Sequence, residues 1–264
     1  MNSLKEALQN VKYFLLDMDG TVYLGDKLIG EMDKTLDSVR KSGRKIIYLT
    51  NNSSKTLSEY ESKLKKMNLF RDGDRVYSSG VAAIEFLKRN RNGKSVCLLG
   101  TENFKRDLIS AGITVAEAEP DICLLAYDTE LTYKKLCAFT DGLFGGAEYI
   151  ATHPDAVCPT SGYSVPDAGS FISMIKTAAD REPEIVIGKP YTGMGDELKS
   201  AYNATGNEFI MVGDRLHTDI AFGVNCGFHT LFVLSGEGTA DMVSKSEKKP
   251  EYILNSLNDI VEYL

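Results

Sequence analysis

The chain has 264 residues, of which 43% are hydrophobic and 25% are charged, and its net charge at pH 7 is −7. This composition is ordinary for a globular protein, and the length allows one large domain or two smaller ones. The negative charge argues against nucleic acid as the main partner, and no apolar run is long enough to predict a membrane span.

The N-terminal residues and the cysteines both predict a cytoplasmic protein. The first ten residues lack the apolar core of a secretory signal peptide. The five cysteines are scattered, and none forms a Cys-x-x-Cys pair. This pattern favours buried, reduced thiols over disulfides or a metal site.

The first part of the chain alternates short apolar runs with amphipathic stretches. Strands are predicted at Tyr13–Leu16 and Ile46–Leu49, and helices at Met32–Lys41 and Leu57–Met67. This alternation of strand and helix is typical of a parallel sheet covered by helices.

The rest of the chain repeats this alternation. Further strands are predicted, in chain order, at Val96–Leu99, Ile122–Ala126, Tyr149–Ala151, Ile185–Ile187, Phe209–Val212 and, as the last strand, Thr230–Leu234. A final helix is predicted at Ser256–Tyr263. The residues alone allow either one long sheet or a core with an inserted second domain.

Four of these strand-like runs end in polar residues that could share one site. The polar groups are Asp17-Met18-Asp19-Gly20-Thr21, Thr50-Asn51-Asn52, Lys189, and Asp214 with Asp219. Open parallel sheets bind ligands at the carboxyl ends of their strands. There, one carboxylate can attack phosphorus, a second can act as acid and base, and a lysine with amide and hydroxyl donors can hold phosphate oxygens. Several acidic oxygens can also bind Mg²⁺.

Each fragment alone has an ordinary structural explanation. Thr50-Asn51-Asn52-Ser53 is typical of a loop that caps a helix, Gly188-Lys189-Pro190 of a strand exit, and Gly213-Asp214-Arg215 of a turn. The hypothesis of a phosphate site therefore rests on all four fragments occurring in order, each directly after an apolar run.

The set resembles the haloacid dehalogenase superfamily of phosphohydrolases. Its four motifs would be Asp17-x-Asp19-Gly-Thr-Val, Thr50-Asn51, Lys189, and Gly213-Asp214-x-x-x-Thr218-Asp219. Four segments are similar to class IIA, the group with NagD-type and p-nitrophenyl-phosphatase-like enzymes: Thr50-Asn51-Asn52-Ser53-Ser54, Ala151-Thr152-x-Pro154-Asp155, Val165-Pro166-x-Ala168-Gly169-Ser170 and Ile187-Gly188-Lys189-Pro190. The resemblance runs from Tyr13 to about Ser235.

The resemblance implies a nucleophile, an acid and base, and a metal site. Asp17 would be the nucleophile and a Mg²⁺ ligand. Asp19 would be the acid and base, with its backbone carbonyl on the metal. Asp214 would be the third protein ligand, and Asp219 would support the metal either directly or through another residue.

The phosphate-binding residues follow from the same resemblance. Thr50, Asn51 and Asn52 would bind the phosphate group. Lys189 would neutralise both the nucleophile and the phosphate, and it counts with Asp17 and Asp19 as catalytic.

The resemblance also implies the fold and the partners. It predicts an α/β protein with a Rossmann-like, doubly wound parallel-sheet core, residues 1–78 and 184–264, and an inserted α/β cap domain of the C2 type, residues 79–183. The expected partner is a small phosphorylated metabolite such as a sugar phosphate, with p-nitrophenyl phosphate as a generic substrate. Neither nucleic acid nor a membrane is expected, and a homodimer through the cap stays open.

Two positions in the cap segments depart from the family pattern. His153 stands where relatives usually have Asn or Asp, and Asp167 stands where they often have Gly. His153 and Asp155 are the candidates for contact with the part of the substrate beyond its phosphate. The alternative is that Pro154 and Asp155 only shape a turn.

Other functions use a subset of these residues. A receiver-type signalling domain also holds an aspartyl-phosphate, and a phosphotransferase, a dehalogenase and a pure binding protein are further alternatives. Asp19 favours phosphate-ester hydrolysis, because an ester oxygen needs a proton as it leaves whereas a halide does not. The natural substrate stays open.

Overall fold

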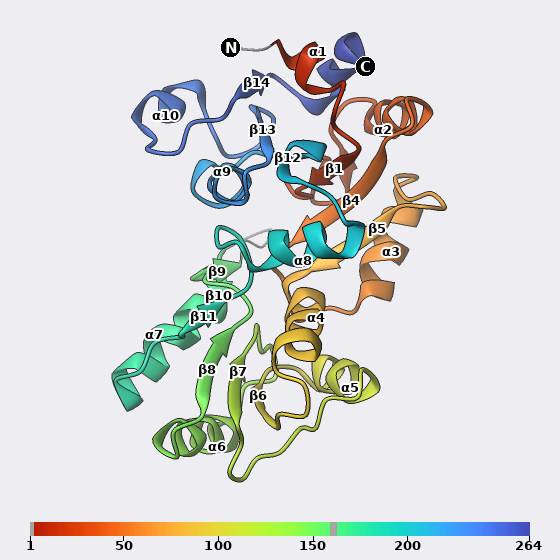
Figure 1. Ribbon diagram of the computed structural model, residues 1–264. Coiled ribbons are helices and arrows are strands. Elements are labelled where there is room, and N and C mark those ends of the chain that lie inside the picture. Colours follow the sequence, from red (N-terminus) through yellow and green to blue (C-terminus); the bar gives the residue numbers. More distant parts are fainter. Residues whose placement is uncertain (1–2, 159–162) are drawn as a thin grey trace. The chain divides into compact units, whose positions relative to one another are not determined.

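A computed structural model of the chain describes residues 3–158 and 163–264, and the chain divides into two compact units (Figure 1). The first unit comprises Met1–Thr50, Leu57–Tyr77 and Lys189–Leu264, and the second comprises Asn51–Thr56 and Ser78–Gly188. The predicted cap, residues 79–183, differs from the second unit by residues 51–56, 78 and 184–188.

A six-stranded sheet forms the centre of the first unit, with the strand order β14-β13-β12-β1-β4-β5. The strands are β1 (Tyr13–Leu16), β4 (Lys45–Thr50), β5 (Arg75–Ser78), β12 (Phe209–Gly213), β13 (His229–Val233) and β14 (Tyr252–Leu254). β1 pairs in parallel with β4 and β12, and β13 pairs in parallel with β12 and β14. The predicted doubly wound parallel sheet is confirmed.

Helices cover this sheet and bury its apolar side chains. They are α1 (Leu4–Ala7), α2 (Met32–Lys41), α3 (Leu57–Lys66), α8 (Gly193–Tyr202), α9 (Ala221–Cys226) and α10 (Ala240–Lys245), with 3₁₀ turns η1 (Gly206–Glu208) and η3 (Leu257–Tyr263), a π-helical turn η2 (Leu216–Ile220) and a small hairpin of β2 (Tyr23–Leu24) and β3 (Lys27–Leu28). All four residues of β1 are buried, as expected for a parallel strand with both faces covered. Its position between β4 and β12 places the end of β1 at the middle of the sheet edge.

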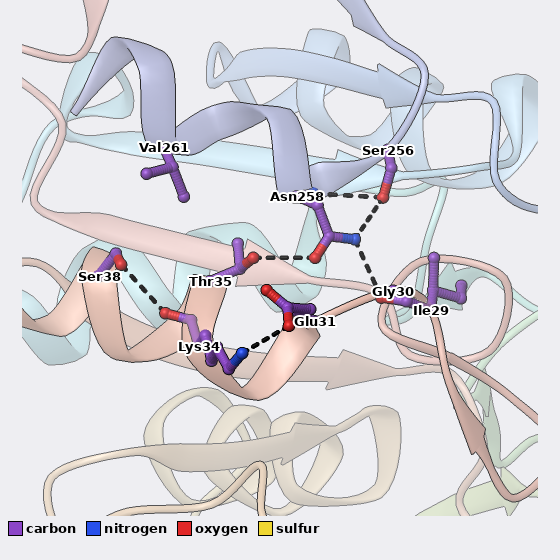
Figure 2. A pocket seen from close by; sticks show the side chains of 9 residues that line it. All are labelled: Ile29, Gly30, Glu31, Lys34, Thr35, Ser38, Ser256, Asn258 and Val261. Carbon is purple, nitrogen blue, oxygen red and sulfur yellow. Dashed lines mark hydrogen bonds and ion pairs between the residues drawn. The ribbon is translucent and has the colours of Figure 1, made fainter.

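The C-terminal turn η3 is held against α2 by one asparagine. The side-chain amide of Asn258 accepts a hydrogen bond from Thr35 Oγ1 at 2.9 Å and donates to the carbonyl oxygen of Ile29 at 2.9 Å (Figure 2). A shallow pocket lies beside these bonds, lined in part by Lys34 and Val261. Within its lining, Asn258 also donates to Ser256 Oγ at 2.7 Å, and Lys34 forms an ion pair with Glu31.

A four-stranded parallel sheet, in the order β11-β8-β7-β6, forms the second unit. Its strands are β6 (Val96–Leu99), β7 (Ile122–Leu125), β8 (Glu148–Ala151) and β11 (Ile185–Val186). Around them lie α4 (Ser79–Asn90), α5 (Glu102–Ser110), α6 (Tyr133–Phe144), α7 (Ala168–Ala179) and an antiparallel pair of β9 (Val157–Cys158) and β10 (Val165–Pro166). Phe139 and Tyr149 pack edge to face in its core.

Three expectations need correction. Thr230–Leu234 is not the last strand, because β14 follows it in the sheet, and the final helix is a 3₁₀ turn with Leu257 and Ile260 buried three residues apart. The five cysteines are free, but they are not all buried: Cys137 is exposed and Cys158 is half-buried.

Within residues 3–158 and 163–264, no helix combines the length and the apolar character that crossing a bilayer requires.

Candidate active site

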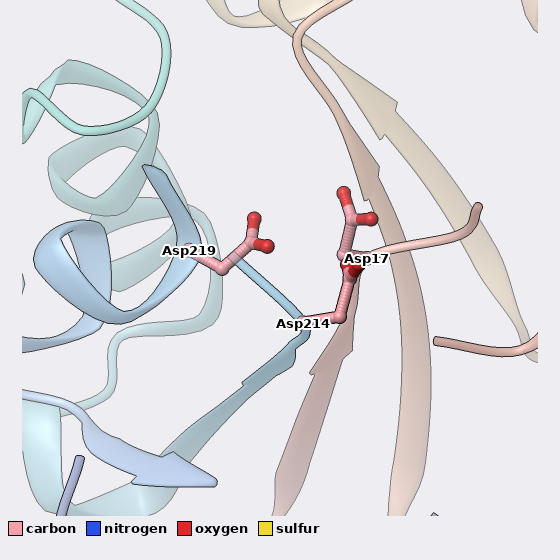
Figure 3. Close-up of side chains that lie close together, drawn as sticks. All are labelled: Asp17, Asp214 and Asp219. Atoms are coloured by element: carbon pink, nitrogen blue, oxygen red, sulfur yellow. The ribbon is translucent and has the colours of Figure 1, made fainter. Parts of the chain in front are cut away.

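The central edge of the first unit carries a cluster of three aspartates. Asp17 and Asp214 directly follow β1 and β12, and because these strands are parallel neighbours, both carboxylates emerge at the same edge. Asp219 lies in η2, the turn after Asp214. One carboxylate oxygen from each aspartate lies within 4.8 Å of the others (Figure 3).

A buried lysine neutralises part of this cluster. The Nζ atom of Lys189 lies 2.7 Å from Asp17 Oδ1 and 2.7 Å from Asp219 Oδ1, and its side chain is 3% exposed. Burial acts to lower the pKa of Lys189, but the two carboxylates outweigh it and raise this pKa, so the ammonium stays charged. Burial and the nearby Asp219 raise the pKa of Asp17 to about 6, although Lys189 acts in the opposite direction.

Asp214 is buried with one oxygen bonded and the other without a hydrogen-bond partner. Its Oδ2 accepts the backbone N–H of Glu237 at 2.8 Å, whereas Oδ1 has no partner among the described residues. Burial and the charge of Asp17 raise the pKa of Asp214. An unpaired buried carboxylate oxygen in an all-oxygen cluster with excess negative charge fits a hard divalent cation such as Mg²⁺.

Two glycines allow the backbone to approach Asp214 closely. A Cβ atom on Gly20, which has a φ of +88°, would lie 2.4 Å from Asp214 Oδ2, and one on Gly236 would lie 2.0 Å from the same atom. Ser235 Oγ donates a hydrogen bond to the Gly20 carbonyl at 2.8 Å. The loop after β13 therefore helps to hold Asp214 in place, and sequence reasoning missed it.

Asp19 and Thr50 lie at the same sheet edge. Asp19 follows β1, is exposed, and contributes no carboxylate to the cluster of Asp17, Asp214 and Asp219. Thr50 ends β4, the parallel neighbour of β1. The exposed carboxylate of Asp19 can meet a substrate or a water molecule, as its predicted role requires.

The predicted phosphate loop belongs to the second unit from Asn51 onward. The side-chain amide of Asn51 donates to Asp155 Oδ2 at 3.1 Å, and the backbone carbonyl of Asn51 accepts a short hydrogen bond from Ser79 Oγ. Asn52 Oδ1 accepts from the backbone N–H of Ser54 at 2.9 Å and from its hydroxyl at 2.8 Å. Asn52 thus shapes a turn, the ordinary explanation of this fragment.

His153 lies in the same unit and is completely buried. Its exposed fraction is 0%, Nε2 lies 2.9 Å from Asp167 Oδ1, and Nδ1 lies 2.9 Å from Thr152 Oγ1. Its predicted contact with substrate stays a prediction. Asp155 is only half-buried, which makes it the more accessible of the two candidates.

Two family models match the chain. A model described as haloacid dehalogenase-like hydrolase matches residues 14–114, and a second hydrolase model of the same superfamily matches residues 186–260. An acid sugar phosphatase from Staphylococcus haemolyticus is 31% identical over 258 residues, which cover 97% of this chain and 98% of that protein.

Solved structures of similar proteins match nearly the whole length of the chain. A 4-nitrophenylphosphatase from Thermotoga maritima has a TM-score of 0.92 and 34% identity, with 97% of this chain and 98% of that chain covered. A p-nitrophenyl phosphatase from Archaeoglobus fulgidus has a TM-score of 0.89 and 26% identity, covering 97% of this chain and 100% of that chain. A structure described as a putative nagD protein has a TM-score of 0.89 and 32% identity, with 96% and 98% covered.

Proposed function

The chain belongs to the haloacid dehalogenase-like hydrolases and is a NagD-like phosphatase, and from that premise we propose that it hydrolyses small phosphate monoesters through an aspartyl-phosphate on Asp17, with Mg²⁺. The observation that carries the proposal is the arrangement of Asp17, Asp214, Asp219 and Lys189 at one sheet edge. This arrangement combines the proposed nucleophile Asp17, the buried ammonium of Lys189, and Asp214 Oδ1, which has no hydrogen-bond partner among the described residues.

The proposed chemistry has two displacement steps at phosphorus. A carboxylate oxygen of Asp17 attacks phosphorus, and the bond to the ester oxygen breaks while Asp19 donates a proton to that oxygen. Asp19 then takes a proton from a water molecule, whose oxygen attacks phosphorus and displaces the Asp17 carboxylate. The products are an alcohol and inorganic phosphate, and both aspartates return to their starting state.

Lys189 would stabilise the charge in both steps. Its ammonium contacts Asp17 directly and can offset the negative charge that gathers when an anionic phosphate approaches a carboxylate. Thr50, Asn51 and Asn52 are the proposed donors to the other phosphate oxygens.

We propose that Mg²⁺ is held by the carboxylates of Asp17 and Asp214 and by the backbone carbonyl of Asp19. When bound, it would polarise the phosphate and reduce its repulsion by the aspartates. Asp219 has Oδ1 on Lys189 and Oδ2 on the backbone N–H of Arg215 at 3.2 Å. Because both of its oxygens have partners, these contacts favour a supporting role for Asp219 through Lys189.

The proposed substrate is a sugar phosphate or a similar small metabolite. The first support is the acid sugar phosphatase from Staphylococcus haemolyticus, and the second is the pair of nitrophenyl phosphatases that share the fold. A panel of phosphate esters assayed with Mg²⁺ tests the proposal, with p-nitrophenyl phosphate as the generic substrate. Release of phosphate from none of these esters would refute it.

We further propose a cytoplasmic enzyme whose second unit, within the predicted limits 79–183, acts as the cap. Asp155 would contact the part of the substrate beyond the phosphate, and His153 is the weaker candidate because it is buried. A homodimer through the cap is tested by light scattering coupled to size-exclusion chromatography.

Asp19→Ala should slow turnover by about 10²–10⁴-fold, the usual size of general acid and base assistance. The loss should be larger for esters with a poor leaving group than for p-nitrophenyl phosphate, since nitrophenolate leaves without a proton. Steady-state kinetics on both kinds of ester measure this difference. An unimpaired rate on a poor leaving group would contradict the assigned role.

Gly236→Ala should weaken Mg²⁺ binding by about 10–100-fold, the typical effect of disturbing a group that orients a metal ligand. A Cβ atom at this position would lie 2.0 Å from Asp214 Oδ2 and must displace that carboxylate. Calorimetric titration with Mg²⁺ measures the affinity without relying on turnover. Gly145→Ala is the control, because a Cβ atom there meets nothing nearer than 3.3 Å. Equal affinity in wild type and Gly236→Ala would contradict the role of this loop.

A further inference from the structure

A chain of buried polar side chains runs through the second unit. It starts at the backbone N–H of Tyr127, which lies 3.0 Å from Ser53 Oγ, and continues over 3.1 Å from Ser53 Oγ to Thr152 Oγ1. From there it passes to His153 Nδ1 and, across the imidazole ring, to Asp167 Oδ1, with 2.9 Å at each of these two contacts. The four side chains of the chain are all buried.

The donors along this chain can be assigned in one direction. The Tyr127 N–H donates to Ser53 Oγ, the Ser53 hydroxyl donates to Thr152, and the Thr152 hydroxyl donates to His153 Nδ1. His153 Nε2–H then donates to the Asp167 carboxylate. In this arrangement each hydroxyl both accepts and donates once, and each ring nitrogen of His153 has one partner in the chain.

One end of the chain is anchored at a helix N-terminus. Asp167 is the N-cap of α7, and its Oδ1 also accepts the backbone N–H of Ala168 at 2.6 Å. The segment Pro154–Asp155 packs closely against the first turn of α7. The N–H of Gly169 donates to the Asp155 carbonyl at 2.8 Å, and a Cβ atom on Gly169 would lie 2.2 Å from the Pro154 carbonyl oxygen. This end is therefore rigidly placed.

The other end holds the segment that begins with Asn51. Ser79 Oγ, which donates to the Asn51 carbonyl, also lies 3.4 Å from His153 Nδ1. The side chain of Asn51 is enclosed as well, because a Cβ atom on Gly188 would lie 2.7 Å from Asn51 Oδ1 and 2.8 Å from His153 Cβ. His153 is thus linked to the fragment Asn51–Ser53 by two routes. One route passes through Thr152 to Ser53, and the other passes through Ser79 to the carbonyl of Asn51.

We propose that His153, with Thr152 and Asp167, is a positioning residue that fixes Asn51 for phosphate binding. This assignment rests on the proposed phosphatase function, in which Asn51 is a phosphate donor. A buried imidazole with both nitrogens bonded has no free atom for a substrate, but it can transmit the rigidity of the α7 terminus to Ser53 and Asn51.

The decisive variant is Thr152→Val, which keeps the shape of the side chain and removes the hydroxyl between His153 and Ser53. Thr140→Val is the matched control, because Thr140 lies in α6 of the same unit and its hydroxyl contacts the carbonyl oxygens of Leu136 and Cys137 in its own helix. We expect Thr152→Val to raise the inhibition constant of inorganic phosphate and to lower kcat/KM by about 3–10-fold each, the effect of one hydrogen bond. Thr140→Val should stay within about twofold.

A second measurement tests the hydrogen-bonded link from His153 through Thr152 to Ser53 without using activity. Amide hydrogen exchange, read by mass spectrometry, should be faster in peptides that contain residues 51–54 of Thr152→Val and unchanged in those of Thr140→Val. His153→Phe should act in the same direction and more strongly, and Thr152→Ser, which restores the hydroxyl, should recover wild-type values.

The outcomes are distinct. Unchanged exchange in residues 51–54, or faster exchange with unchanged phosphate inhibition, would overturn the positioning role. If the wild type hydrolysed no phosphate ester, the proposed function would be wrong. Faster exchange in Thr152→Val would still show that Thr152 holds residues 51–54 in place.

Discussion

Asp17→Asn should abolish turnover, with a loss of about 10⁴-fold or more, as expected when a covalent nucleophile is removed. An amide oxygen does not attack phosphorus as a carboxylate does. The fold should survive, because Asn has the size of Asp and Lys189 keeps its ion pair with Asp219 at 2.7 Å. The aspartyl-phosphate should also disappear, which quenched-flow labelling with radioactive substrate can measure.

Asp196→Asn is the matched control for this experiment. Asp196 lies in α8 of the same unit, its side chain is 52% exposed, and its partner is Lys199 at 2.9 Å. The same chemical change there should leave turnover within about twofold, since exposed ion pairs contribute little. Substantial activity in Asp17→Asn at an equal folded fraction would show that catalysis through Asp17 is wrong.

The central strands, and the polar fragments that follow them, could be predicted from the sequence because both depend on local residue patterns. Runs such as Tyr13–Leu16 are apolar throughout and end in polar residues, which is the pattern of a buried parallel strand. β14 was missed because it has three residues and follows the polar stretch of Lys248, Lys249 and Pro250, so no periodicity could develop. The π-helical turn η2 carries no residue pattern that distinguishes it from an α-helix.

Sequence reasoning identified candidate site residues only where residue types suggest the chemistry. Asp17, Asp214, Asp219 and Lys189 were candidates because carboxylates and a lysine that directly follow strands have few structural uses in combination, and the structure places these four side chains together. The loop Ser235–Gly238 holds Asp214 through the backbone N–H of Glu237, which almost any residue type could supply, and through the close approach of Gly236, which has no side chain. Its Gly-rich turn directly after the strand next to β12 was the one available clue.

His153 shows a different limit of sequence reasoning. Its departure from the family pattern marked the position, but the sequence does not reveal burial or the partner fourteen residues away. A polar residue in a segment predicted to belong to the cap therefore suggested substrate contact. The three-dimensional contacts with Thr152 and Asp167 favour a positioning role instead.

Removal of divalent metal should eliminate activity, and Mg²⁺ should restore it. Three carboxylates and one ammonium leave the cluster with excess negative charge, which would repel a phosphate ester in the absence of a cation. Zn²⁺ should substitute poorly, because the proposed ligands are all hard oxygens and include no His or Cys. Activity after treatment with a chelator, followed by titration with each metal, measures both effects.

Metal binding should also be visible in the pH dependence of stability. The pKa of Asp17 is raised from 3.8 to about 6 in the fold, so between these two pH values the metal-free protein holds a proton there that the unfolded chain has released. The stability from that proton is present at lower pH and is lost as the pH rises through about 6. Mg²⁺ binds the ionised form, so its stabilising effect should be greater above pH 6 than below it.

Thermal denaturation at pH 5 and pH 7.5, with and without Mg²⁺, separates these contributions. The increase in Tm on adding Mg²⁺ should be larger at pH 7.5, and Asp17→Asn should reduce this pH dependence because Asn does not titrate. Asp196→Asn should retain it. Full activity after exhaustive chelation, or an increase in Tm that is larger at the lower pH, would show that the aspartate cluster is not the proposed Mg²⁺ site.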